Sequence, residues 1–277
     1  MKLAASPLTA PGLWESVTIS TFIECQGMSG HSKWSSIKHK KGAADAKRGK
    51  LFTKLARAIT VAARDGGPDP EGNPPLATAI QKARDASMPK DNIQRAVDRG
   101  SGVGTDAAAI ESITFEGYGP GGAAILVDAL TDNRNRTSAD VRHAFTKHHG
   151  NLGEPGSVAW IFEKRGAIAV DASRYGEDDL IVAIDAGAED VLDEGEQLRV
   201  ICEPADLSAV RKALEEAGVE VQSADLTMEP KNTVEVKGSE AEWLLKLVDA
   251  LEEHDDVDSV HANFDVPAEI IEKLAAA

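Results

Sequence analysis

The chain has 277 residues, 42% of them hydrophobic, two cysteines and a formal net charge of −16 at pH 7. This length suffices for two or three domains with cores of their own, and the composition excludes a disordered chain. No apolar run in the sequence approaches the roughly 20 residues that a membrane helix needs, so we expect no membrane partner. Cys25 and Cys202 have no neighbour at metal-ligand spacing, which excludes a disulfide framework and is typical of a cytoplasmic protein.

Residues 1–27 resemble nothing that follows them. They contain prolines at positions 7 and 11, acids at positions 15 and 24 and no unbroken apolar core. These features exclude a secretory signal and an Arg-rich transit peptide. We expect a disordered extension, with Met28 as the natural start of the protein.

Basic residues are concentrated in the next segment. Residues 28–104 hold 15 Lys and Arg against 7 acids, whereas residues 105–277 hold 14 against 37. Within residues 31–64 there are ten Lys and Arg and a single acid, Asp45. Because salt screens charges beyond about 8 Å, a ligand senses this local excess rather than the net charge. The segregation indicates a polyanionic partner.

Residues 31–100 show helical periodicity, interrupted by a Gly- and Pro-rich turn at 66–75. At 100° per residue, Leu55 and Ile59 fall on an apolar stripe, while Lys54 and Arg57 fall on an opposed basic stripe. Two further helices are expected, one at 76–83 and one after Pro89. We predict a basic helical domain over 28–104.

After a Gly/Ser linker the period changes, and strands alternate with helices. Strands are expected at 113–118, 123–131, 158–162, 167–170, 197–202, 220–226, 233–236 and 258–264, and helices at 138–149 (capped by Thr137), 178–186, 207–214 and 239–251. We predict an α+β fold in which an N-terminal helical bundle is followed by two ferredoxin-like α/β domains, the last inserted in the other. Residues 105–152 plus 230–277 would form one domain, and residues 153–229 the inserted acidic domain.

Enzyme-like motifs are weak. Gly117-x-Gly119-x-x-Gly122 matches a dinucleotide loop formally, but Pro120 lies inside it and a strand follows instead of a helix, so we predict a hairpin turn. A nucleotide-binding enzyme that uses this loop is the alternative. The histidines at 143, 148 and 149 are not spaced to share a metal, and the acidic residues at 185–196 lack a calcium-loop register. We expect no catalytic residues, cofactor or metal.

The basic block predicts a surface that binds nucleic acid. Lys and Arg neutralise phosphates, and Trp34, His31 and His39 can stack or form hydrogen bonds. A solvated helix face is the alternative. Arg134 and Arg136 form a second cluster, which either binds phosphate or braces the turn before a helix. The candidate binding residues are His31, Lys33, Trp34, Lys38, His39, Lys40, Lys41, Lys47, Lys50, Lys54, Arg57, Arg134 and Arg136.

Six ordered motifs from residue 28 onward resemble the YebC/PmpR family. They are Met28-Ser-Gly-His-Ser-Lys-Trp34, Ile37-Lys-His-Lys-Lys-Gly42, Met88-Pro-Lys-Asp-Asn-Ile93, Phe115-Glu-Gly-Tyr-Gly-Pro-Gly-Gly122, Thr131-Asp-Asn-Arg-Asn-Arg-Thr137 and Gly156-Ser-Val-Ala-Trp160. One departure is His149, where many relatives have Gly. The resemblance places residues 1–27 outside the family pattern.

The resemblance implies three domains and no enzymatic activity. It implies a probable transcriptional regulator that binds DNA, related to mitochondrial translational activators and to bacterial proteins linked to ribosomes stalled on consecutive prolines. It also implies that the N-terminal lysines and Arg57 form the nucleic-acid surface and that Arg134 and Arg136 face a cleft between domains.

These observations predict a cytoplasmic, non-enzymatic regulator of gene expression with no small-molecule substrate. Its expected partners are DNA, ribosomal RNA or the ribosome. Because lysine is a point charge without the bidentate geometry that reads bases, the basic helix favours contacts with the phosphate backbone. A role on structured RNA is therefore at least as well supported as promoter recognition.

Overall fold

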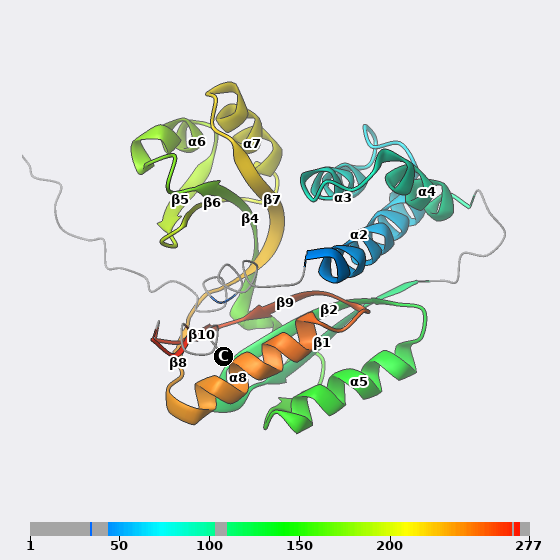
Figure 1. The fold of residues 1–277 in the computed structure, drawn as a ribbon, viewed down its shortest axis with the longest axis vertical. Helices are drawn as coiled ribbons and strands as arrows, with labels where there is room; N and C mark the ends of the chain where they lie inside the picture. The colour runs from blue at the N-terminus through cyan, green and yellow to red at the C-terminus, as the bar shows by residue number, and fades with distance from the viewer. Residues whose placement is uncertain (1–33, 35–43, 103–109, 268, 272–277) are drawn as a thin grey trace, which may run out of the picture.

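The computed structural model describes Trp34 and residues 44–102, 110–267 and 269–271 (Figure 1). The first part is helical and contains α2 (Ala44–Gly66), α3 (Pro74–Asp85) and α4 (Lys90–Gly100). Leu55, Ile59 and Ala63 of α2 pack in one buried cluster with Leu76 and Ile93 of the other two helices. The apolar stripe predicted for α2 is thus the face that it buries.

Asn73 fixes the turn between α2 and α3. Its side-chain oxygen accepts a hydrogen bond from the Leu76 backbone N–H at 3.2 Å, which caps α3. Its amide nitrogen donates to the carbonyls of Ala62 and Gly67, both at 2.8 Å. One buried amide therefore satisfies backbone groups at the end of one helix and at the start of the next.

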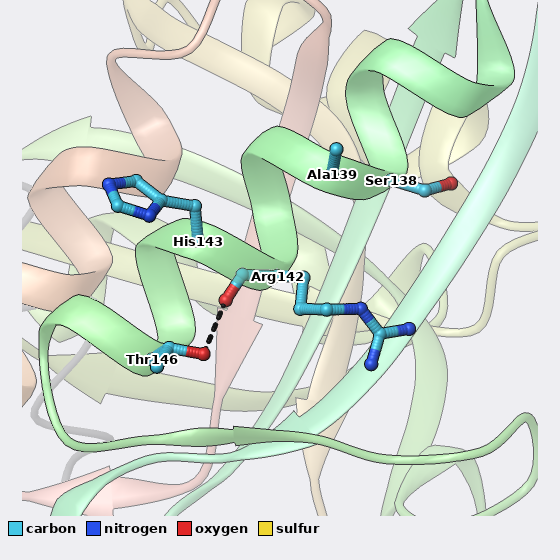
Figure 2. Close-up of a pocket in the computed structure, with 5 residues that line it drawn as sticks. All are labelled: Ser138, Ala139, Arg142, His143 and Thr146. Atoms are coloured by element: carbon cyan, nitrogen blue, oxygen red, sulfur yellow. Dashed lines mark hydrogen bonds between the residues drawn. The ribbon is translucent and has the colours of Figure 1, made fainter.

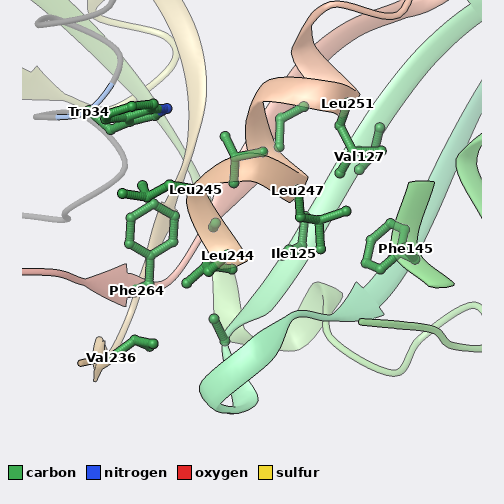
Figure 3. Packing of buried hydrophobic residues seen from close by; sticks show 14 of the residues in the cluster. Trp34, Ile125, Val127, Phe145, Val236, Leu244, Leu245, Leu247, Leu251 and Phe264 are labelled. Atoms are coloured by element: carbon green, nitrogen blue, oxygen red, sulfur yellow. The ribbon is translucent and has the colours of Figure 1, made fainter. Parts of the chain in front are cut away.

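A four-stranded antiparallel sheet follows, in the order β3-β1-β2-β9. Its strands are β1 (Glu111–Tyr118), β2 (Ala124–Thr131), β3 (Asn151–Leu152) and β9 (Val257–Ala262), with α5 (Arg134–Lys147) and α8 (Gly238–Glu252) against one face. Figure 3 shows Leu244 and Leu247 of α8 beside Ile125 and Val127 of β2, with Phe145 of α5 beyond them. A parallel pair, β8 (Val234–Glu235) and β10 (Phe264–Asp265), lies at the end of this domain.

The chain between β3 and β8 forms the second α/β unit. It contains β4 (Phe162–Asp171), α6 (Ile181–Asp185), β5 (Ala188–Asp193), β6 (Gln197–Cys202), α7 (Leu207–Glu216) and β7 (Val221–Pro230). The sheet order β5-β6-β4-β7 with two helices is the ferredoxin-like βαββαβ arrangement. The predicted fold class is confirmed. The chain returns so that Ala262 of β9 pairs with Ile125 of β2 across more than 130 residues.

A buried carboxylate holds the segment that leads into the inserted unit. Both oxygens of Glu116 accept backbone N–H groups, from Gly156 at 2.7 Å, Val158 at 2.7 Å and Ala159 at 2.8 Å. Burial raises the pKa of Glu116, but the three N–H donors outweigh it and hold the pKa below its ordinary value. A charged acid on β1 thus fixes the first connection between the two sheets.

Three local predictions were wrong. Helix α5 begins at Arg134 rather than Ser138, because Asn133 is the cap and its side chain accepts the Arg136 N–H at 3.1 Å. Residues 159–161 form a 3₁₀ turn that leads into β4 rather than a strand. The third error is an omission, since residues 188–193 form strand β5 at the edge of its sheet, where Glu189, Asp190 and Asp193 are exposed.

The glycine motif forms the predicted hairpin turn. Residues Pro120–Gly122 are a 3₁₀ turn between β1 and β2, closed by the Gly119 N–H donating to the Ala123 carbonyl at 2.7 Å. Gly121 has a φ of +72°, which favours glycine. The strand β2 follows directly, so the loop does not open into the helix N-terminus that a dinucleotide site needs. Within the described residues, no helix is long and apolar enough to span a bilayer.

Candidate nucleic-acid interface

The basic stripe of α2 faces the turn between α8 and β9. The Lys54 ammonium donates to the Glu252 carbonyl at 2.7 Å, and the Lys50 ammonium lies 3.5 Å from the Asp255 carboxylate. Burial lowers the pKa of Lys54, opposed by the acids of this turn and by Asp258. Lys50 and Lys54 thus contact the acidic turn between α8 and β9 in this structure.

Asp256 connects the helical domain to the first α/β domain. Arg57 donates to one carboxylate oxygen at 2.7 Å, and Arg136 donates to the other at 2.8 Å. The hydroxyls of Thr137 and Thr131 add hydrogen bonds to that second oxygen at 2.7 and 3.2 Å. The Asp256 side chain is only 4% exposed. We call this set of five residues the Asp256 network.

The charge of Asp256 is maintained by its partners. Burial raises its pKa, but hydrogen bonds from Arg136, Thr137 and Arg57 outweigh burial and bring the pKa to about 2. The carboxylate therefore stays ionised and balances two guanidinium groups. Sequence reasoning missed Asp256, because it lies 199 residues from Arg57 and no local pattern marks it.

The two arginines in the first turn of α5 behave differently. Arg136 donates hydrogen bonds to Asp132 and Asp256 at 2.8 Å each. These contacts fit the alternative in which the cluster braces the turn before the helix. Arg134 is exposed on the first turn of α5. Only one member of this cluster is thus engaged in the Asp256 network.

Trp34 lies in the core rather than on the surface. Its side chain is 5% exposed and belongs to the cluster formed by α8 and the first sheet (Figure 3). Its indole N–H donates to the Asp249 carboxylate at 2.9 Å. The prediction that Trp34 is available to stack on a base does not fit this position, because burying the large ring and satisfying its only donor occupies it fully.

Most of the remaining candidates cannot be placed. His31, Lys33, Lys38, His39, Lys40 and Lys41 lie outside the described residues, and Lys47 lies in the first turns of α2 without a described side chain. Arg48, which follows Lys47 in α2, is exposed.

The helical domain also contacts the inserted unit. Arg211 of α7 binds both oxygens of Asp85 at 3.0 and 3.2 Å, and Lys82 of α3 lies 3.3 Å from Asp225 of β7. Figure 1 shows the helical and inserted domains on the side of the first sheet opposite α5 and α8. Ion pairs therefore hold the helical domain against both α/β domains.

Helix α5 carries exposed basic side chains. An open hollow of about 500 Å³ on it is lined by Ser138, Ala139, Arg142, His143 and Thr146 (Figure 2). Arg142 and His143 point to opposite sides of the helix, and both are exposed. In the part of the chain that the structure describes, no three His, Cys, Asp or Glu side chains are placed to share a metal ion.

Comparison with known proteins assigns the family. The TACO1/YebC protein N-terminal domain matches residues 32–103, and the TACO1/YebC second and third domain matches residues 110–264. A probable transcriptional regulatory protein of Rubrobacter xylanophilus is 59% identical over 249 residues, spanning 90% of this chain and 100% of the relative. One from Geotalea uraniireducens is 56% identical over 247 residues, spanning 89% and 100%.

A solved structure supports the same assignment. The crystal structure of a conserved hypothetical protein from Aquifex aeolicus aligns with a TM-score of 0.79 at 48% identity, covering 86% of this chain and 98% of that one. The chain therefore belongs to the TACO1/YebC family.

Proposed function

We propose that this protein is a non-enzymatic regulator of gene expression that binds nucleic acid through its N-terminal basic segment. The observation that carries the proposal is the charge segregation: 15 basic against 7 acidic residues over 28–104, in a chain of net charge −16. A basic segment in an acidic protein draws a polyanion to one region of the surface. The names of the relatives, probable transcriptional regulatory proteins, support a regulatory role.

We propose that the basic residues have two separate roles. Lys50, Lys54 and Arg57 contact residues 252–256 and fix the orientation of α2. The residues left for phosphate binding are those upstream in sequence, chiefly Lys33, Lys38, Lys40, Lys41 and Arg48. We infer that α2 anchors this segment to the α/β domains and that the segment makes the contacts with nucleic acid.

Two nucleic acids are candidates, and one property of the segment bears on the choice. Its cations are mainly lysines, which neutralise phosphates without reading base edges. Ribosomal RNA in the cytoplasm fits such contacts at least as well as a promoter, in keeping with a translation role that includes relief of stalling at consecutive prolines. A DNA-binding transcription regulator predicts instead a specific site bound about a thousandfold more tightly than random DNA.

Sedimentation of the tagged protein through a sucrose gradient tests the proposal. The variant Lys38→Glu/Lys40→Glu/Lys41→Glu removes charge without touching Lys50 or Lys54, whose loss would also disturb the contact with the α8–β9 turn. A matched control reverses three exposed lysines elsewhere, Lys164, Lys212 and Lys231.

We expect the wild type and the control to travel with ribosomes at low salt and the triple variant to stay at the top of the gradient. If the wild type stays at the top, binding to genomic DNA fragments is the second assay. Binding in neither assay overturns the proposal. Binding that the N-terminal reversal leaves unchanged overturns the assignment of the segment.

A further inference from the structure

We propose that the outer face of α5, together with Trp243 of α8, binds a single-stranded segment of nucleic acid, with phosphates on Lys147 and Lys246 and an unpaired base on Trp243. This inference deepens the proposed function and rests on it. It concerns residues that the basic N-terminal block does not include.

The first support is the charge of α5. Arg142, His143 and Lys147 are all exposed, whereas Val141 and Phe145 of the same helix are buried. Asp140 is the one acid in this helix, and its carboxylate lies 3.3 Å from the ring of His254. In a region where residues 105–277 carry 37 acids against 14 basic residues, a helix with this balance attracts phosphate.

The second support is a cluster of aromatic and basic side chains where α5 ends beside α8. Trp243 is 38% exposed. The ring of His149 meets it edge-on with centroids 4.5 Å apart, and the Lys246 ammonium lies 5.0 Å from its centroid. An exposed indole beside a cation is a combination on which proteins stack unpaired bases.

The backbone at His149 supports the same site. His149 has a φ of +62°, a conformation that non-glycine residues seldom adopt. With this backbone conformation the His149 side chain is exposed, and its imidazole lies edge-on against Trp243.

Positive charge converges at this end of α5. Burial lowers the pKa of His148, and Lys147, Lys246, His149 and His143 lower it further. Lys147 and Lys246 both lie close enough to lower the pKa of His148, so both ammonium groups would attract an anion at this end of α5. The side chains of Lys147 and Lys246 are both exposed.

The shape of the basic face favours a single strand over a duplex. Helix α8 places Glu240 and Glu242 beside Trp243, so the positive surface is about one helix wide. From Arg136 in the Asp256 network to Lys147 the helix rises about 16 Å at 1.5 Å per residue. A strand bound near the helical domain can therefore continue along α5 to Trp243.

Fluorescence anisotropy with three labelled probes tests the inference: oligouridine, oligothymidine of equal length and an RNA duplex. The variants are Trp243→Ala, Trp243→Phe and the double reversal Lys147→Glu/Lys246→Glu. The charge-matched control is Lys164→Glu/Lys212→Glu, at two exposed lysines of the inserted unit. Circular dichroism of each variant reports whether it is folded.

We expect Trp243→Ala to weaken single-strand binding about tenfold while duplex binding is unchanged, because only an unpaired base can stack. Trp243→Phe keeps an aromatic face and restores most of the affinity. The double reversal makes the plot of log affinity against log salt concentration shallower. The magnitude of its slope falls by about 1.4, the value for two lost phosphate contacts. Tighter binding of oligouridine than of oligothymidine identifies RNA as the ligand, and the reverse identifies DNA.

Three results overturn the inference, and they can be distinguished from one another. If the wild type binds none of the probes and no ribosome, the proposed function fails with it. If the N-terminal reversal at Lys38, Lys40 and Lys41 abolishes binding while the α5 and α8 variants match the control, the proposed function stands and this inference is wrong. Equal losses for single strand and duplex in Trp243→Ala also contradict it.

Discussion

Helices α2 and α5 both carry basic residues, but their surroundings differ. On α2, Lys50, Lys54 and Arg57 meet carbonyls and carboxylates of residues 252–256. On α5, Arg142 and Lys147 are exposed. The comparison teaches that a basic stripe in the sequence indicates a phosphate-binding surface only when the stripe does not contact an acidic segment from elsewhere in the same chain.

The substitution Asp256→Asn should have the largest effect, because it removes the carboxylate that Arg57 of α2 contacts. It leaves Arg57 and Arg136 without the charge that both share. Removing one member of a buried ion pair costs about 3–5 kcal/mol, so we expect a loss of that order in the free energy of unfolding. Urea denaturation measures it. Asp132→Asn, at an exposed acid that also bonds to Arg136, is the control and should change stability by less than about 0.5 kcal/mol.

Low pH should weaken the same contact without any substitution. The pKa of Asp256 is about 2 in the folded protein, below the value of about 3.9 for a free carboxyl. A lowered pKa stabilises the fold fully above the unfolded value, and this contribution is lost as the pH falls from about 4 toward 2. Thermal midpoints measured across that window should fall less steeply in Asp256→Asn than in the wild type. Parallel curves would contradict the prediction.

Paired substitutions at Arg57 and Arg142 sharpen the comparison between the two helices. Arg57→Met removes one of two guanidinium groups from a buried carboxylate, and we expect a loss of about 2 kcal/mol in stability. Arg142→Met, at an exposed position, should cost less than about 0.5 kcal/mol. Binding of single-stranded RNA should be weakened by Arg142→Met. Equal losses of stability in Arg57→Met and Arg142→Met would contradict the difference between α2 and α5.

The smallest effect is expected at Lys50. Its ammonium lies 3.5 Å from Asp255, and both side chains are more than half exposed. Exposed ion pairs contribute between about 0 and 1 kcal/mol. Lys50→Met should therefore barely shift the urea midpoint. Weakening this contact by raising the salt concentration should have a similarly small effect on the urea midpoint. A loss comparable to that of Arg57→Met would show that α2 depends on Lys50 as well.

Sequence patterns were sufficient for the fold because the elements carry strong local signals. Val200 and Leu198 alternate with polar residues in β6, and Leu207, Val210 and Leu214 mark one face of α7. Strand β5 was missed because it lies at a sheet edge, where acidic residues replace the alternation of a buried strand. Asn133 was missed as a cap because Thr137, four residues later, offered a similar signal.

The site was less predictable than the fold, because its contacts join distant segments. The basic stripe of α2 was correct as a stripe, but residues 252–256, which meet it, lie about 200 positions away. Trp34 looked like a stacking residue because its partner in the core, Asp249, is 215 positions distant. The cluster at Trp243 was also missed, since His149 and Lys246 come together only when α5 lies beside α8.

The long separation between Arg57 and Asp256 also has a consequence in time. Synthesis at about 5–20 residues per second needs roughly 10–40 s to cover the 199 residues between them. During that interval β9 has not been made, so the first sheet lacks an edge strand, whereas the inserted unit can complete its four strands. On the nascent chain, Lys50, Lys54 and Arg57 of α2 therefore lack these partners until residues 252–256, in the last tenth of the protein, emerge from the ribosome.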